Sequence, residues 1–298
     1  MPMDDSPVNA CPACGKTLRP WFVKQGHEIL SCRECGVIAA GGVGSAGRDG
    51  RTVYEGTDNI FMKDNNELYY LDETNLWSFR EKLVWVQRHV ARGGRLLDAG
   101  SNFGHFLKTA EGSYDAMGFD ISDVAVEWSR KNFGVKAIVA SVYDIRGKET
   151  GHFDAITCWD FIEHLPDPAA AIRILESLLA PGGKLFFSTP DAGSTLARIE
   201  GRFWHFIDPV QHWFLFPHGS LGQLLEQEGL MVVDRCSFGH YYRLRYVFNR
   251  LLQLHERGLL RVVTIITRKA LFFMLDRPVY VKMGDVMGLA ATVRGSAM

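Results

Sequence analysis

The 298-residue sequence predicts an α/β fold: a doubly wound, mainly parallel sheet of seven strands, with a small metal-binding module ahead of it. Three observations predict this organisation. From residue 95 onward, short apolar runs alternate with amphipathic segments, which is the pattern of parallel strands joined by crossover helices. A glycine-containing loop follows the first of these runs, where sheets of this class bind ligands. Near the N-terminus, four of the six cysteines form two matched pairs.

The cysteine pairs predict a zinc ribbon. Each pair has the form Cys-x-x-Cys-Gly, with Cys11 and Cys14 in the first and Cys32 and Cys35 in the second. Four thiolates fill the tetrahedral shell of Zn²⁺ and leave no position for a substrate, so we expect a structural ion. Two disulfides or a redox site are the alternative, which a reducing compartment disfavours. Residues 21–30 should form a hairpin between the pairs.

The chain divides into three parts. Residues 1–40 form the ribbon, and residues 41–75 form a linker and connector that begins with a glycine-rich stretch. Residues 76–298 form the main domain. Its first helix is expected over residues 76–90, where apolar side chains recur at helical spacing.

The remaining elements follow in order. We expect strands at residues 95–99, 116–119, 136–140, 153–158, 184–188, 230–237 and 287–293. Helices are expected near residues 104–111, 123–133, 168–179 and 219–228. Cys158 and Cys236 fall in apolar strand-like runs, so we expect them to be packing residues.

The loop after the first strand indicates a nucleoside ligand. Asp98 ends the strand, and Gly100 and Gly104 allow a ligand to approach the backbone. Asp120 ends the second strand, at the distance where nucleotide binders place a carboxylate on the ribose. An NAD site is the alternative, but the loop lacks the spacing of a pyrophosphate site. The acid at Asp98 favours a ligand with a cationic tail, such as an ammonium or a sulfonium.

Four segments together resemble the class I S-adenosylmethionine-dependent methyltransferases. They are Leu-Leu-Asp-Ala-Gly-Ser-Asn-Phe-Gly from residue 96, Gly-Phe-Asp from residue 118, Phe-Asp-Ala-Ile-Thr-Cys-Trp-Asp-Phe-Ile-Glu-His-Leu-Pro-Asp-Pro from residue 153, and Leu-Ala-Pro-Gly-Gly-Lys-Leu-Phe-Phe-Ser-Thr-Pro from residue 179. The resemblance covers residues 76–293 and implies a Rossmann-like methyltransferase fold. The third and fourth segments are similar to the branch that includes ubiquinone-biosynthesis and sugar methyltransferases. The ribbon, connector and methyltransferase order also resembles bacterial proteins of polysaccharide and deoxysugar pathways.

The resemblance implies a set of cofactor-binding residues. Two positions depart from the family pattern: Asn102 replaces the middle glycine of the loop, and Ser141 replaces the acid that meets the adenine. Asparagine tolerates left-handed backbone better than most residues, and the Val142 amide can substitute for the acid. The implied residues are Asp98, Gly100, Ser101 and Gly104 around the methionine half, Asp120 on the ribose, Ile121, Ser141 and Val142 near the adenine, and Trp159 at the end of the fourth strand.

Three histidines are candidates for the catalytic base. Methyl transfer from a sulfonium needs the acceptor to be positioned and its proton removed, and histidine has a pKa near working pH. His164 follows the fourth strand, and His212 and His205 follow the fifth. A structural role is the alternative for each. The aromatic residues around them form either an acceptor-binding wall or a lid packed on the core: Trp204, Phe206, Trp213, Phe214 and Phe216.

Residues 241–282 form a basic helical insertion before the last strand. They hold nine Lys or Arg and two acidic residues, a local charge of +7 in a chain whose net charge is −1. A wide apolar face with basic flanks suits peripheral contact with an anionic membrane. Helices that cover the acceptor cleft or form a homodimer face are the alternative.

The leading function is methyl transfer from S-adenosylmethionine to a sugar, glycan or lipid-linked glycan intermediate. The first alternative is an RNA methyltransferase that binds its substrate through the ribbon, but the ribbon carries few basic residues. A non-catalytic scaffold that binds the cofactor is the second alternative. The near-neutral net charge does not favour nucleic acid. We see no secretory signal and no apolar run long enough to span a membrane, so we expect a cytoplasmic protein, peripheral to the membrane at most.

Overall fold

The computed structural model describes residues 10–42, 71–147, 151–254 and 259–295. Its centre is a seven-stranded sheet in the order β10-β13-β8-β7-β4-β5-β6. Only β13 runs antiparallel to its neighbours, β8 and β10. The predicted α/β fold is therefore confirmed. The strands are β4 (Arg95–Ala99), β5 (Asp115–Asp120), β6 (Lys136–Val139), β7 (Phe153–Trp159), β8 (Leu179–Pro190), β10 (Leu230–Ser237) and β13 (Val286–Val293).

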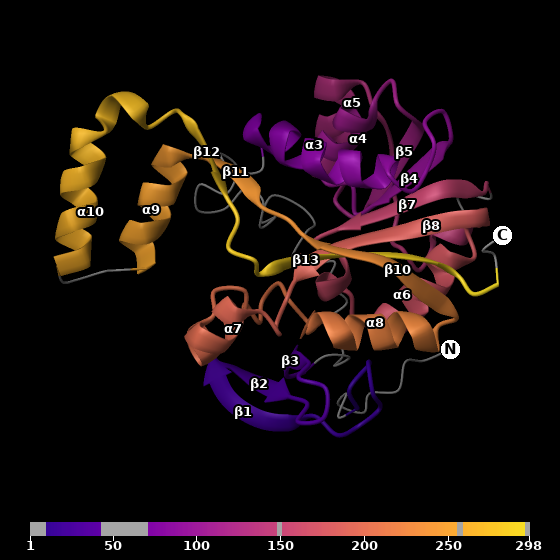
Figure 1. The fold of residues 1–298 in the computed structure, drawn as a ribbon, viewed down its shortest axis with the longest axis horizontal. Helices are drawn as coiled ribbons and strands as arrows, with labels where there is room; N and C mark the ends of the chain where they lie inside the picture. Colours follow the sequence, from indigo (N-terminus) through magenta and orange to yellow (C-terminus); the bar gives the residue numbers. More distant parts are fainter. Residues whose placement is uncertain (1–9, 43–70, 148–150, 255–258, 296–298) are drawn as a thin grey trace.

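Helices cover both faces of this sheet (Figure 1). One face carries α3 (Thr74–Gln87), α4 (His105–Ala110) and α5 (Asp123–Phe133). The other carries α6 (Pro168–Glu176) and α8 (His218–Gln227). The predicted helices are confirmed, and their starts have clear chemical signals. Ser122 caps α5 by accepting from the Ala125 amide, and Asp167 caps α6 by accepting from the Ala170 amide.

The ribbon is built into the main domain by a shared sheet. Its hairpin consists of β1 (Arg19–Lys24) and β2 (His27–Ser31), as predicted, and β3 (Ile38–Ala40) pairs with β2. The fourth strand is β9 (Phe214–Leu215), which the main domain contributes and which pairs with β3. The sequence gives no sign of a strand so short. The domain boundary near residue 40 thus falls inside a continuous sheet, and most of the predicted linker and connector lies outside the described residues.

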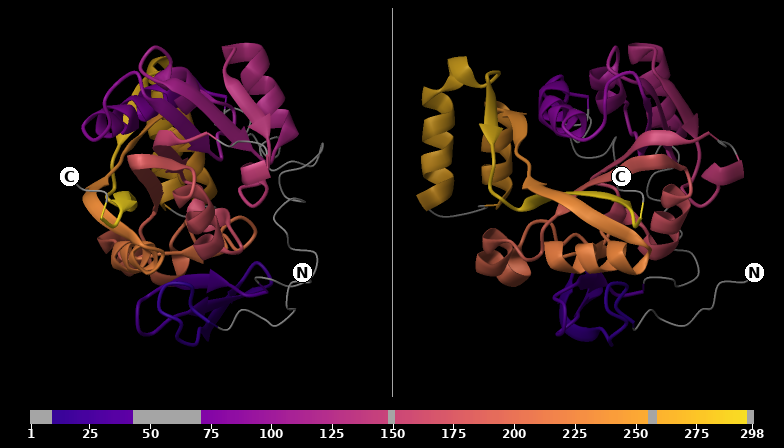
Figure 2. Two further views of the ribbon diagram at one scale, coloured as in Figure 1. Left: turned by 90° about the vertical axis from the view of Figure 1, so that its right-hand side faces the viewer. Right: turned by 45° about the vertical axis from the view of Figure 1, so that its right-hand side comes forward.

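The insertion before the last strand is only partly helical, which corrects the sequence-based expectation. It starts and ends in a strand pair of its own, β11 (His240–Arg243) with β12 (Pro278–Val281). Between these strands, α9 (Leu244–Leu254) and α10 (Leu259–Ala270) form a helical hairpin that projects away from the central sheet (Figures 1 and 2). Tyr241 and His240 of β11 hydrogen-bond to Ser78 and Asn75 of α3, so the insertion is attached through its strands.

Three short elements lie in the loops that follow β7 and β8. They are the 3₁₀ helices η3 (Ile162–His164) and η4 (Gly201–Phe203), and the helix α7 (Thr195–Glu200). Two others lie elsewhere, η2 (Ile145–Gly147) and η5 (Phe272–Met274). Among the helices that the structure describes, none combines the length and the hydropathy that a bilayer crossing requires.

Candidate active site

The loop between β4 and α4 has the backbone that the sequence predicts. Gly100 and Gly104 adopt φ angles of 72° and 74°, and Asn102 lies in the same left-handed region at 48°. The prediction that Asn102 replaces a glycine there is confirmed. A Cβ atom on Gly104 would lie 2.8 Å from Cβ of Ser129, so this position also needs glycine for space. The loop therefore brings bare backbone to the carboxyl edge of the sheet.

Asp98 and Asp120 are buried at this edge, on neighbouring strands. Asp98 Oδ1 accepts from the Thr157 hydroxyl at 2.7 Å, and burial raises the pKa of Asp98 to about 7 despite this bond. Asp120 accepts from the amides of Asn102 and Ser122 at 2.8 and 2.9 Å, and burial raises its pKa as well. Two carboxyl groups with so little exposure favour a cationic or hydroxyl-rich ligand between them.

The other implied cofactor residues lie around these acids. Ser101 is buried, and its hydroxyl has no hydrogen-bond partner within the described chain, so it fits a polar ligand group at the loop. Ile121 follows Asp120, and the Ala140 amide donates to the Asp120 carbonyl, which aligns the turn containing Ser141 and Val142 with the end of β5. The residues present therefore fit an adenosine flanked by a charged methionine.

Trp159 occupies the predicted strand end, but its side chain has other neighbours than expected. Its indole is buried among Phe106, Phe238 and Trp85, between the sheet and α3. Its side chain is thus part of the apolar packing, and only its backbone follows the strand edge.

Lys82 forms a polar network that sequence reasoning missed. Its ammonium group donates to Asp160 at 3.0 Å and to Ser188 at 2.8 Å, while its side chain is 3% exposed. The rings of Phe79, Trp159 and Phe238 surround the charge at 5.1 to 5.6 Å. Asp160 has a φ of 50°, an uncommon conformation for a residue that is not glycine. The strain and the buried cation mark the end of β7 as a constrained position.

His164 and His212 come together, although 47 residues separate them. Their rings lie 4.9 Å apart, and burial lowers the pKa of both. Glu163 completes the group: the ligand atoms of these three residues all lie within 4.8 Å of one another. Burial raises the pKa of Glu163 to about 7, and one of its oxygens accepts from the Thr189 hydroxyl at 2.9 Å.

His205, the third predicted base, lies apart from this group. Its Nδ1 atom is 3.4 Å from Glu200, and its Nε2 atom is 3.8 Å from Asp285. The structure thus brings together two of the three predicted histidines.

The aromatic residues of the same loop are mostly core, not an exposed wall. Trp204, Trp213, Phe214 and Phe216 are buried, and Phe206 is partly buried. The alternative of a segment packed on the core is therefore confirmed for these four residues. Their packing explains why the loop has a defined path: it continues into β9, which the ribbon holds.

The four N-terminal cysteines form one cluster. Cys11 and Cys35 have sulfur atoms 3.4 Å apart, and so do Cys14 and Cys32. These distances exceed the length of a disulfide and approach the spacing of about 3.8 Å between thiolates on one tetrahedral Zn²⁺. All four are free thiols, and the residues present fit a structural zinc ion.

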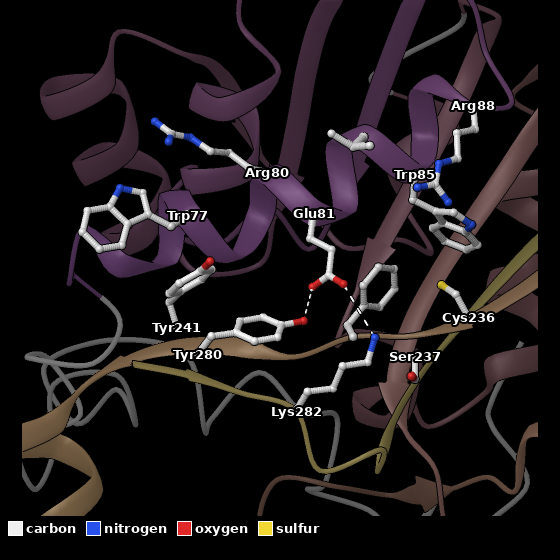
Figure 3. Close-up of a pocket in the computed structure, with 12 residues that line it drawn as sticks. Trp77, Arg80, Glu81, Trp85, Arg88, Cys236, Ser237, Tyr241, Tyr280 and Lys282 are labelled. Carbon is white, nitrogen blue, oxygen red and sulfur yellow. Dashed lines mark hydrogen bonds and ion pairs between the residues drawn. The ribbon is translucent and has the colours of Figure 1, made fainter. Parts of the chain in front are cut away.

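A cavity of about 680 Å³ lies between α3 and the strands β10, β11 and β12 (Figure 3). Its wall combines aromatic rings with three basic side chains, Arg80, Arg88 and Lys282. Glu81 crosses it, accepting from the Tyr280 hydroxyl at 2.7 Å and lying 3.8 Å from Lys282. Phe238 lines the cavity and also contacts the Lys82 charge, so the cavity adjoins the network at the end of β7.

Comparison with known proteins identifies the main domain. Residues 77–235 match the family model described as "Methyltransferase domain". A ubiquinone biosynthesis O-methyltransferase of Xanthomonas oryzae pv. oryzae is 39% identical over 103 residues, which is 33% of this chain and 43% of that protein. The Acinetobacter baylyi protein of the same name is 28% identical over 117 residues, or 36% and 49%. The chain thus spans less than half the length of these relatives.

A solved structure supports the fold. The phosphoethanolamine N-methyltransferase 2 of Haemonchus contortus, in complex with S-adenosyl-L-methionine, superposes with a TM-score of 0.51 at 16% identity, over 87% of this chain and 63% of that one. At this identity the likeness concerns the fold alone. Because the family model covers more than half of the chain, the chain belongs to the methyltransferase domain family.

Proposed function

We propose that the protein is an S-adenosylmethionine-dependent methyltransferase. The observation that carries this proposal is the pair of buried acids, Asp98 and Asp120, beside a left-handed loop at the carboxyl edge of the sheet. Asp98 would pair with the cationic methionine half, and Asp120 would accept the ribose hydroxyls. The Ser101 hydroxyl would take the polar end of the methionine, and Ile121, Ser141 and Val142 would border the adenine.

The cofactor, when bound, supplies a methyl group already activated on a sulfonium. The chain then has to hold the acceptor in line with it, exclude water and remove the acceptor proton. His164 and His212 are the base candidates that best fit this task. Burial lowers the pKa of both, so they are neutral near pH 7 and able to accept a proton. We assign His205 a structural role, since it faces Glu200 and Asp285.

The acceptor that we propose is a sugar, a glycan or a lipid-linked glycan that carries phosphate. The support comes from the cavity beside α3. Its tryptophan and tyrosine rings offer flat faces to a sugar, and Arg80, Arg88 and Lys282 offer charge to phosphate oxygens. A phenolic hydroxyl is the second candidate, because the curated relatives are named ubiquinone biosynthesis O-methyltransferases.

Two further assignments belong to this proposal. We propose that Cys11, Cys14, Cys32 and Cys35 hold a structural Zn²⁺, which their spacing supports. We also propose that the α9–α10 hairpin contacts an anionic membrane surface. Val262, Val263 and Ile266 of α10 are about half exposed or more, and basic Arg268 and Lys269 follow them.

Calorimetry with S-adenosylmethionine tests the function first. We expect one binding site in the wild type and a large loss of affinity in Asp120→Asn, with Asp123→Asn, at the exposed first residue of α5, as the control. Labelled donor should then be incubated with glycolipid extract, with a catechol and with bulk RNA. Label in the glycolipid supports the proposal, label in the catechol selects the second candidate, and label in RNA alone would refute both. A wild type that binds no cofactor would refute the enzyme assignment.

A further inference from the structure

We infer that Asp160 binds the acceptor hydroxyl, and that Lys82 and Ser188 hold its carboxylate in position for this. Asp160 directly follows β7, the central strand of the sheet. Its side chain is 47% exposed, whereas nearby Trp159 and Ile162 are buried. The inference rests on the proposed function and specifies the kind of acceptor that this function uses.

Both carboxylate oxygens of Asp160 are held from the protein side. Lys82 Nζ donates to Oδ2 at 3.0 Å, and the Ser188 hydroxyl donates to Oδ1 at 3.0 Å. The Lys82 ammonium also donates to the Ser188 hydroxyl oxygen at 2.8 Å, which directs the hydroxyl proton toward Asp160. A carboxylate accepts about four hydrogen bonds, so its exposed side can accept further bonds from a ligand.

The charge of Asp160 is fixed as well as its orientation. Desolvation raises the pKa of Asp160, but the Lys82 charge and the hydrogen bonds outweigh it, so this pKa lies below its ordinary value. The lysine side chain is 3% exposed and the acid is 47% exposed, so the pair turns its negative end to solvent. The φ of 50° at Asp160 is costly for an aspartate, and such strain is typical of functional positions.

Asp160 lies beside the loop that we propose to bind the cofactor. Strand β4, which carries Asp98, pairs with β7 in parallel. The Phe161 ring packs on the loop, since a Cβ atom on Gly100 would lie 2.3 Å from that ring. The Lys82 charge acts on Asp98 as well as on Asp160. The exposed carboxylate is therefore next to the place where the methionine half would bind.

This arrangement favours one class of acceptor. A hydroxyl that donates its hydrogen to Asp160 keeps its oxygen lone pairs available to the methyl carbon, so the acid orients the nucleophile. An acceptor carboxylate would meet a like charge and be disfavoured. A phosphate on the acceptor would lie away from Asp160, and the basic cavity beyond Phe238 offers such a place. We therefore expect the product to be a methyl ether and not a methyl ester.

Initial rates at limiting acceptor test the role of Asp160, with labelled donor and either glycolipid extract or catechol. Asp160→Asn suits this test because asparagine tolerates the left-handed backbone. We expect it to lower the rate at least about tenfold, because a hydrogen bond to a charged group is lost. Its Kd for S-adenosylmethionine should stay within about twofold of the wild type. The control is Asp115→Asn, which also breaks an ion pair with a lysine, at the opposite edge of the sheet, and should transfer as the wild type does.

A double-mutant cycle tests whether Lys82 acts through Asp160. Lys82→Met should lower the rate severalfold, and Lys82→Met/Asp160→Asn should be no slower than Asp160→Asn alone. A lysine that only supports the fold would lower the rate by the same factor in both backgrounds, which would overturn its positioning role. Calorimetry with S-adenosylmethionine checks that each variant is folded.

The outcomes separate this inference from the proposed function. Label in the glycolipid extract should stay bound in mild alkali, as in an ether; release of volatile labelled methanol would indicate an ester and overturn the hydroxyl assignment. If Asp160→Asn binds the cofactor and transfers as fast as the wild type, the role of Asp160 is overturned and the function stands. A wild type that labels neither acceptor would refute the proposed function, and this inference with it.

Discussion

The buried carboxyl group of Asp98 predicts how cofactor binding depends on pH. Burial raises its pKa to about 7, so the folded protein keeps this proton below pH 7. Only the ionised form pairs with a cation. We therefore expect the affinity for S-adenosylmethionine to rise about tenfold per pH unit from pH 5.5 to 7 and then to level off.

The raised pKa of Asp98 has the opposite effect on the free energy of unfolding of the ligand-free protein, which falls as pH rises. The unfolded chain loses this proton near pH 4, before the folded chain does, so the contribution of Asp98 to stability falls as pH rises from about 4 to 7. Calorimetry at each pH and thermal melts measure both trends, and Asp98→Asn should remove both. A wild-type affinity that is constant from pH 5.5 to 7.5 would contradict the assignment.

The buried Lys82 makes a prediction about stability. Lys82→Met keeps most of the side-chain volume against Phe79 and Trp159 but leaves Asp160 and Ser188 without their donor. Because the Asp160 side chain is 47% exposed and can be hydrated, we expect a loss of about 1–3 kcal/mol, less than for a fully buried pair. Urea denaturation measures it. Arg80→Met, on the exposed side of the same helix, should change stability by less than about 0.5 kcal/mol. An equal loss in both variants would show that the network is not the cause.

At the scale of residues, sequence reasoning succeeds where local chemistry decides. The left-handed backbone of Asn102 is predictable because few residues other than asparagine and glycine tolerate it. Lys82 was missed because a lysine in an amphipathic helix normally faces solvent, and its partners Asp160 and Ser188 lie 78 and 106 residues away. The pairing of His164 with His212 depends on the path of a loop, which no local pattern fixes.

At the scale of elements, the ribbon holds the loop that carries His212. The amide of Ala40 donates to the Trp213 carbonyl, and the Trp213 amide donates to the Glu163 carbonyl at 2.8 Å. Strand β3 pairs with β9 directly after His212. The ribbon therefore connects the cysteine cluster to the loop of His212, where we propose that the acceptor binds, and not to the loop of Asp98 and Asp120.

Loss of the proposed zinc ion should thus impair acceptor binding selectively. We expect Cys11→Ser/Cys14→Ser to lower the zinc content by one ion, to lower Tm by several degrees and to reduce methyl transfer at least about tenfold. The Kd for S-adenosylmethionine should change less than about twofold. Metal analysis, melting curves and calorimetry measure these effects, and Cys236→Ser is the control cysteine. A variant that loses cofactor binding in parallel with turnover would show that the ribbon supports the whole domain.

We predict that the α9–α10 hairpin contacts a membrane through apolar side chains that follow α10. Phe272 and Phe273 are each 76% exposed directly after α10. Phe272→Ser/Phe273→Ser should reduce sedimentation with phosphatidylglycerol vesicles severalfold. The control is Ile199→Ser/Phe203→Ser, a pair of similar exposure on α7 and η4. Equal sedimentation of both variants and the wild type would refute the membrane contact.

Element boundaries were predictable where amphipathic pattern and capping agree, as in α5, whose bounds match the prediction to the residue. Three strands were not predictable. β9 has two residues, too few for any periodicity, and it forms only because β3 lies beside it. β11 and β12 pair across more than thirty residues of intervening chain, so their pairing depends on tertiary contacts with α3.

At the scale of the whole molecule, two neighbouring sites have different roles in the reaction that we propose. The buried acids lie at the carboxyl edge of the sheet, and the basic aromatic cavity lies beyond Phe238, between α3 and the strands of the insertion. Sequence patterns locate the first site, because its residues follow consecutive strands. They do not locate the second, because α3, β10 and β12 are distant in the chain and form the cavity only after folding.

Because the two sites are separate, we predict that charge reversal in the cavity weakens binding of the acceptor and leaves binding of the cofactor unchanged. Arg80 of α3 and Arg88, the C-cap residue of the same helix, both line the cavity. Arg80→Glu/Arg88→Glu should raise KM for a phosphate-bearing glycan acceptor at least about tenfold, with kcat nearly unchanged, because remote contacts contribute mainly uniform binding. Its Kd for S-adenosylmethionine should equal that of the wild type. Arg92→Glu lies on the exposed turn just beyond α3, outside the cavity, and should leave KM unchanged. If KM for an uncharged acceptor rises as much as KM for the phosphorylated one, the arginines do not recognise phosphate and the cavity serves the acceptor by shape alone.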